Sequence, residues 1–168
     1  MRRLFAALAA ASLMAAPALA SDWRVDRDAS TVEFETTVFG GVTRGMFSDF
    51  DADITLDPQD LSNARIEAIV RTASGAMGNA DYQSALTGRQ GLAPGDHPEA
   101  RFLSEDVRAV EGGYEAHGVL SIKGVEIELI LPFTLEITGD RAVADGSFTV
   151  NRETFNIGGS GWGDVGAE

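Results

Sequence analysis

Residues 125–138 alternate strictly between apolar and mostly polar side chains. One parity holds seven apolar residues, Val125, Ile127, Leu129, Leu131, Phe133, Leu135 and Ile137. Because successive side chains of a strand point to opposite faces, this period predicts a strand with one apolar face and one largely wet face. The segment is far longer than the usual strand of about five or six residues. Such a strand fits an antiparallel sheet that wraps around an interior.

Residues 1–20 have the pattern of a secretory signal peptide. A basic head, Met1-Arg2-Arg3, precedes an apolar run that ends in Ala18-Leu19-Ala20. The pattern predicts cleavage after Ala20 and one mature domain over residues 21–168. The apolar run is shorter than the about 20 residues that a spanning helix needs. We therefore expect export without stable insertion into the membrane.

The charge and the lack of cysteine exclude several classes of function. The 13 Lys and Arg residues less Arg2 and Arg3 leave 11 against 26 acidic residues in the mature chain, a net charge near −15. Such a surface disfavours binding to nucleic acid and to anionic membranes. The chain has 0 cysteines, which excludes disulfides, thiolate zinc sites, iron–sulfur clusters and thiol catalysis.

The two-residue period recurs along the mature chain. It predicts further strands over residues 30–38, 42–56, 61–72, 100–107, 114–123 and 141–151. Gly40-Gly41 and Gly139-Asp140 are typical of tight turns, whereas Gly124 indicates a sharp bend rather than a full turn. Asn79 is expected to cap a short helix that runs through Leu86. The fold class is therefore an all-β antiparallel domain of seven or eight strands, and the pattern alone leaves barrel and sandwich open.

Small side chains recur on the predicted inner face. The clearest row is Ala142, Ala144, Gly146, Phe148 and Val150, which begins small and ends large. Small barrels are either filled by side chains or hold one small ligand. The row therefore has two readings. It leaves an apolar hollow suited to a hydrocarbon, or it lets the sheet coil and taper.

Few residues are typical of catalysis or metal binding. His97 and His117 are predicted to lie at the surface, without a carboxylate or hydroxyl at a catalytic spacing. Residues 49–53 look like the start of a calcium loop, but Ile54 and Asp60 stand where such a loop needs Gly and Glu. We therefore expect no metal, no cofactor and no catalytic residue.

Several motifs resemble, in order, those of the YceI-like family. They are Asp22–Asp26 followed by Ser30–Phe34, Gly45–Phe50, His97–Phe102, Gly118–Val125 and Asn151–Gly158. The resemblance implies a lipocalin-like, eight-stranded antiparallel barrel that is exported to the periplasm and binds a polyisoprenoid or related amphiphile. It also implies that a homodimer can form. Residues 79–92 depart from the family because the paired aromatics of its cap are missing.

We expect a binding protein and not an enzyme, which holds an isoprenoid-like lipid in transport, storage or stress response. The predicted ligand-binding residues line the barrel or close its ends: Val32, Phe34, Phe50, Ile54, Ile66, Ala68, Val70, Tyr82, Leu86, Phe102, Tyr114, Ala116, Leu120, Leu129, Leu131, Phe133, Ala144, Phe148, Arg152 and Trp162. Arg152 has two readings, contact with a polar ligand head or a structural salt bridge at the barrel end.

Two alternatives stay open at this point. An enzyme acting on a lipid or quinone would need inward-facing polar groups, for which Tyr114 and Arg152 are the candidates. A ligand-free structural or stress protein would need a barrel that its own side chains fill.

Overall fold

The computed structural model describes residues 22–159 and 165–166. The predicted signal peptide (residues 1–20) and Trp162 lie outside them. The described chain forms one α-helix, α1 (Ala80–Thr87), and two short 3₁₀ helices, η1 (Thr72–Ser74) and η2 (Arg152–Phe155). Its ten strands are β1 (Asp22–Arg24), β2 (Val32–Val38), β3 (Gly41–Phe47), β4 (Phe50–Asp57), β5 (Asp60–Arg71), β6 (Gly75–Met77), β7 (Glu99–Val110), β8 (Gly113–Ile122), β9 (Val125–Thr138) and β10 (Arg141–Gly146).

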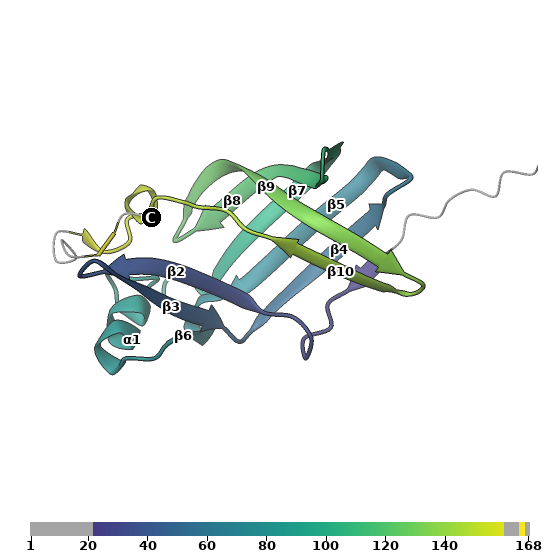
Figure 1. The fold of residues 1–168 in the computed structure, drawn as a ribbon. Coiled ribbons are helices and arrows are strands. Elements are labelled where there is room, and N and C mark those ends of the chain that lie inside the picture. Colours follow the sequence, from purple (N-terminus) through teal and green to yellow (C-terminus); the bar gives the residue numbers. More distant parts are fainter. Residues whose placement is uncertain (1–21, 160–164, 167–168) are drawn as a thin grey trace, which may run out of the picture.

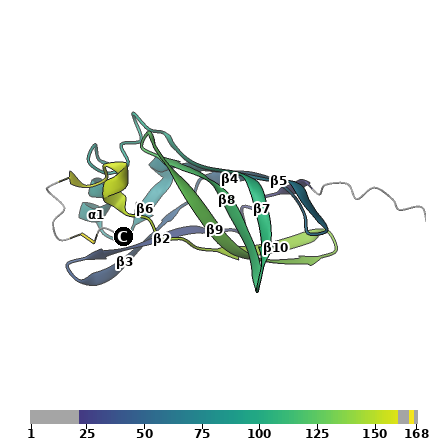
Figure 2. The ribbon, with the colours of Figure 1, turned by 90° about the horizontal axis from the view of Figure 1, so that it is seen from above.

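Seven strands curl into a nearly closed antiparallel barrel (Figure 1). Their order is β1-β4-β5-β7-β8-β9-β10, and a second sheet has the order β2-β3-β6. The β2–β3 hairpin and α1 lie at one end of the molecule, as the view from above also shows (Figure 2). The predicted all-β barrel with one short helix is confirmed. The strand count differs from the expected eight, because seven strands form the main sheet and three form a separate one.

The predicted strand over residues 42–56 is two strands in different sheets. The backbone N–H of Ser48 bonds to the carbonyl of Ser74 at 3.5 Å, and that of Asp49 bonds to the Ser74 hydroxyl at 3.1 Å. These bonds end the β3 ladder and start β4 afresh. The side-chain parity shifts at this corner. Met46 has the same sequence parity as Phe50 but is exposed, whereas Phe47 is half-buried.

The last predicted strand, over residues 141–151, ends early. β10 pairs with β9 only as far as Gly146, which lies opposite Phe133. The next residue in this register, Ser147, would face Pro132. Proline has no N–H to donate, so the ladder stops there. Phe148 was expected to face inward as part of this strand. It lies outside β10 and is 45% exposed.

Two local predictions have different outcomes. Lys123 and Gly124 both have positive φ, 52° and 77°, between the paired residues Ile122 and Val125. This is a full two-residue hairpin turn, so the bend predicted at Gly124 was wrong. The helix cap is confirmed, because the side chain of Asn79 accepts hydrogen bonds from the backbone N–H groups of Asp81 and Tyr82.

Candidate ligand-binding site

The interior of the barrel has one tightly packed wall. Buried side chains come from β5, β7 and β8, where Ile66, Phe102, Ala116 and Leu120 belong to one hydrophobic core cluster. Ala116 is 0% exposed and Leu120 5% exposed. These four predicted ligand-binding residues therefore fill space in the described structure.

The opposite wall is loosely packed. The inner row of β9 packs toward the same core, yet every member is only half-buried: Val125, Ile127, Leu129, Leu131, Phe133 and Leu135. Ala144 lies opposite Leu135 on β10 and so shares the inner face, but it is exposed. Apolar inner surface on β9 and β10 is therefore accessible from outside the protein.

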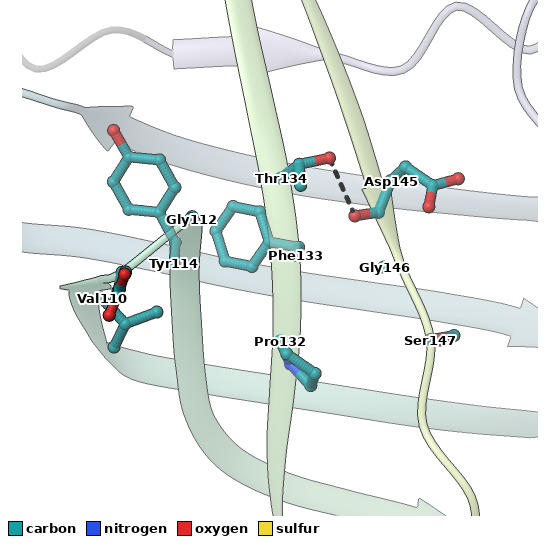
Figure 3. Close-up of a pocket in the computed structure, with 11 residues that line it drawn as sticks. Val110, Gly112, Tyr114, Pro132, Phe133, Thr134, Asp145, Gly146 and Ser147 are labelled. Atoms are coloured by element: carbon teal, nitrogen blue, oxygen red, sulfur yellow. Dashed lines mark hydrogen bonds between the residues drawn. The ribbon is translucent and has the colours of Figure 1, made fainter.

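A cavity lies where β8, β9 and β10 meet. Its volume is about 280 Å³, and its lining includes Tyr114, Phe133, Gly146 and Ser147. Figure 3 shows the rings of Tyr114 and Phe133 side by side; their centroids are 5.4 Å apart and their planes 24° from parallel. The Tyr114 hydroxyl has no hydrogen bond to any described residue. The site thus combines the apolar faces of the two rings with polar groups, among them the hydroxyls of Tyr114 and Ser147 and the carboxylates of Glu111 and Asp145.

The other predicted lining residues lie around this interior. Ile54, Ala68, Leu129 and Leu131 are half-buried and pack against the core. The predicted residues Val32, Phe34, Phe50, Val70 and Tyr82 are also half-buried, and Leu86 of α1 is buried. The ring of Phe34 lies over Gly45, where an added Cβ would come within 2.2 Å of it, and lies 5.3 Å from the ring of Phe47. Contact of these residues with a ligand stays a prediction.

Arg152 holds the C-terminal segment. Its guanidinium donates to the carbonyl oxygens of Ile157 at 2.7 Å, Gly166 at 2.8 Å and Val165 at 2.9 Å. The N–H of Gly166 in turn donates to the carbonyl of Thr37 on β2. We call this arrangement the C-terminal clasp. Of the two readings of Arg152, the contacts favour closure of the barrel end. Among the described residues, its partners are these three carbonyls and the carboxylate of Glu153 at 3.7 Å.

Lys123 adds a second connection at the same end. Its ammonium group donates to the carbonyl oxygens of Arg89 at 3.2 Å, Gln90 at 3.4 Å and Asn156 at 2.8 Å. Burial lowers the pKa of this lysine. The contacts link the β8–β9 turn, the loop after α1 and η2.

These features can be set beside known proteins. The sequence model of the YceI-like domain matches residues 23–168. The chain belongs to the YceI-like family.

Curated relatives of this chain include proteins named UPF0312. One from Yersinia pestis is 26% identical over 89% of this chain and 83% of the relative. Another, from Pseudomonas savastanoi pv. phaseolicola, is 27% identical over 92% of this chain and 86% of the relative.

Solved structures with the same fold include BcnA of Burkholderia cenocepacia. It has a TM-score of 0.81 and 26% identity over 85% of this chain and 92% of BcnA. The YceI protein of Campylobacter jejuni has a TM-score of 0.64 and 16% identity, over 86% of this chain and 92% of that protein. A polyisoprenoid binding domain from Saccharophagus degradans has a TM-score of 0.64 and 9% identity, over 80% of each chain. The last two likenesses show the YceI-like fold.

His117 of this YceI-like chain lies on the outer face of β8. His117 Nε2 is 3.1 Å from a carboxylate oxygen of Glu115, and the two side chains share a face because they are two residues apart on β8. Among the described residues, no group of three or more His, Asp or Glu could hold a metal ion.

The acidic residues that resembled a calcium loop pair with an arginine. Arg27 donates to Asp49 at 3.5 Å and to Asp51 at 2.8 Å, and all three side chains are exposed. The hydrogen bond from Arg27 holds the pKa of Asp51 below its ordinary value. Within residues 22–159 and 165–166, no helix is long and apolar enough to cross a bilayer.

Sequence reasoning missed part of the interior. Trp23 of β1 packs against the core, and its indole Nε1 donates to the carbonyl of Leu56 at 2.9 Å. Ile127 and Leu135 share the inner row of β9 but were left out of the predicted lining. The alternation of residues 125–138 contained the signal for both.

Proposed function

We propose that this YceI-like protein holds a long-chain, isoprenoid-like amphiphile inside its barrel. The observation that carries the proposal is the half-buried inner row of β9, which continues to the exposed Ala144 on β10. Burying hydrocarbon stabilises a complex by about 0.8 kcal/mol per CH₂, so a long chain laid along this wall would bind tightly.

Related folds support the ligand class. The Saccharophagus degradans domain that shares this fold is described as polyisoprenoid binding. An isoprenoid chain is long, branched and apolar, which suits a wall built from leucine, isoleucine, valine and phenylalanine.

The proposed role is that of an exported carrier or store. The basic head, apolar run and Ala18-Leu19-Ala20 of the N-terminal segment support export to the periplasm. Binding without chemical conversion fits the contacts of Arg152, whose guanidinium is occupied by backbone carbonyls of the C-terminal clasp.

A direct binding titration tests the proposal. Protein stripped of lipid by mild solvent extraction would be titrated with solanesol, a long polyprenol, and with geraniol, a short one. We expect stoichiometric binding of solanesol and much weaker binding of geraniol, because the short alcohol buries fewer CH₂ groups. Circular dichroism would check that the extracted protein remains folded. A folded protein that binds neither alcohol would contradict the proposal.

A further inference from the structure

Among the described residues, two end strands face each other without pairing, although the end of β2 pairs with the C-terminal segment at Val38 and Val165. β10 is an end strand of the seven-stranded sheet, and β2 is an end strand of the three-stranded sheet. Figures 1 and 2 both show the stretch that follows β10 running along β2. Among the described residues, no backbone hydrogen bond joins residues 141–150 to residues 22–38. We call this unpaired line, between β2 and β10 with residues 147–150, the seam.

The hollow reaches the seam. Gly146 and Ser147, at the end of β10, line the 280 Å³ cavity together with Tyr114 and Phe133. Phe148 follows directly and is 45% exposed. The seam is therefore bordered by Phe148 and lies next to the hollow that holds the aromatic pair.

The α1 end of the barrel is better closed than the seam. At the α1 end, the C-terminal clasp and Lys123 bind backbone carbonyls, and Phe155 of η2 is 0% exposed. At the opposite end, Leu56 and Val107 are buried, while the β7–β8 turn lines the hollow itself. A molecule that passed through the α1 end would have to displace packed side chains.

We propose that the ligand enters and leaves the barrel sideways, through the seam; the inference rests on the function proposed above. Parting β2 from residues 147–150 breaks no backbone hydrogen bond, whereas parting any two paired strands of the barrel breaks several. Pro132 contributes to this arrangement. Because it has no N–H, it cannot donate the hydrogen bond that would extend the β9–β10 ladder to residues 147–150.

A blocking experiment tests the route. The chain has 0 cysteines, so a single introduced thiol can be labelled selectively. Phe148→Cys places the thiol at the seam. Ile137→Cys is the matched control, because Ile137 is 38% exposed and lies near the β9–β10 turn at the barrel end. Each variant would receive a polyethylene glycol maleimide. Uptake of radiolabelled solanesol would then be timed with and without the label.

We expect the label on Phe148→Cys to slow uptake about tenfold, and the label on Ile137→Cys to change it less than about twofold. An unchanged rate with the seam labelled, or equal slowing from the end label, would overturn the route while leaving the proposed function intact. Wild-type protein that takes up no solanesol and contains no native lipid would overturn both.

A second measurement does not depend on uptake rates. Ala144→Cys on the inner face of β10 is expected to react rapidly with the maleimide when the protein is empty and about tenfold more slowly with solanesol bound. Val143→Cys, on the outer face of the same strand, is expected to react equally in both states, because Val143 is 55% exposed. Slow labelling of Ala144→Cys in the empty protein, equal to that of the buried Ala116→Cys, would show a closed seam and overturn the inference.

Discussion

The ring of Tyr114 stacks on the ring of Phe133 across the β8–β9 ladder, with 5.4 Å between their centroids. The pair lines the cavity, and both residues are only half-buried. Aromatic pairs of this geometry contribute about 0.5–1.5 kcal/mol beyond the area that they bury. The pair therefore both stabilises this wall of the barrel and forms part of the surface that a ligand would contact.

Phe133→Ala is expected to lower the free energy of unfolding by about 2 kcal/mol and to weaken solanesol binding, because ring stacking and apolar contact are lost together. Tyr114→Phe is the matched control. Its stability should stay within about 0.5 kcal/mol of the wild type, because the Tyr114 hydroxyl has no hydrogen bond to a described residue. Urea unfolding and binding titrations measure both. If Tyr114→Phe lost as much unfolding free energy and solanesol affinity as Phe133→Ala, the roles assigned to the two rings would be wrong.

Ala144→Trp is expected to leave the domain folded but to empty it of ligand. The exposed inner face of β10 has room for the indole, which would occupy the space proposed for the lipid. Val143→Trp places the same group on the outer face of β10. Lipid extracted per mole of purified protein is the readout, and urea unfolding confirms the fold. Full lipid content in a folded Ala144→Trp protein would count against this cavity assignment.

Arg152→Lys is expected to loosen the C-terminal clasp and to cost about 2 kcal/mol of stability. An ammonium group cannot match the planar guanidinium, which bonds to Ile157, Val165 and Gly166 at once. Hydrogen exchange at the N–H of Gly166 should accelerate. Glu153→Gln, which changes only the exposed 3.7 Å ion pair, should have little effect. Unchanged exchange in Arg152→Lys would refute the clasp.

Asp51 gives a prediction of pH dependence. Its hydrogen bond from Arg27 lowers the pKa in the folded state, so the interaction stabilises the protein above the unfolded pKa of about 3.9 and is lost as the pH falls through the lower folded value. Carboxyl NMR should show Asp51 titrating below the ordinary range, and at a higher pH in Arg27→Gln, where the hydrogen bond from the Ala52 N–H still lowers the pKa. The same midpoint in both proteins would contradict the ion pair in solution.

The sequence predicted the parts of the fold that local periodicity controls. β9 begins and ends at the expected residues, because each of its side chains alternates between core and solvent. The cap of α1 was equally local, since Asn79 bonds only to N–H groups two and three residues away. The family motifs then separated barrel from sandwich, which periodicity could not do.

Long-range contacts explain most of what was missed. The corner at Ser48 and Asp49 depends on bonds to Ser74, which no local pattern near residue 48 reveals. The early end of β10 depends on Pro132, a residue of the neighbouring strand. β1 and β6 are three residues each, too short for a periodic signal. Arg152 was placed at the barrel end, but its carbonyl partners come from segments that only the fold brings together.

The most direct test of the central claim is to purify the protein gently from its native host and extract it with organic solvent. Mass spectrometry of the extract is expected to reveal a long-chain isoprenoid-like lipid in near-stoichiometric amount, depleted in Ala144→Trp protein purified in parallel. A folded wild-type protein whose extract contains no lipid above that of the variant would contradict the claim that the barrel is a lipid site.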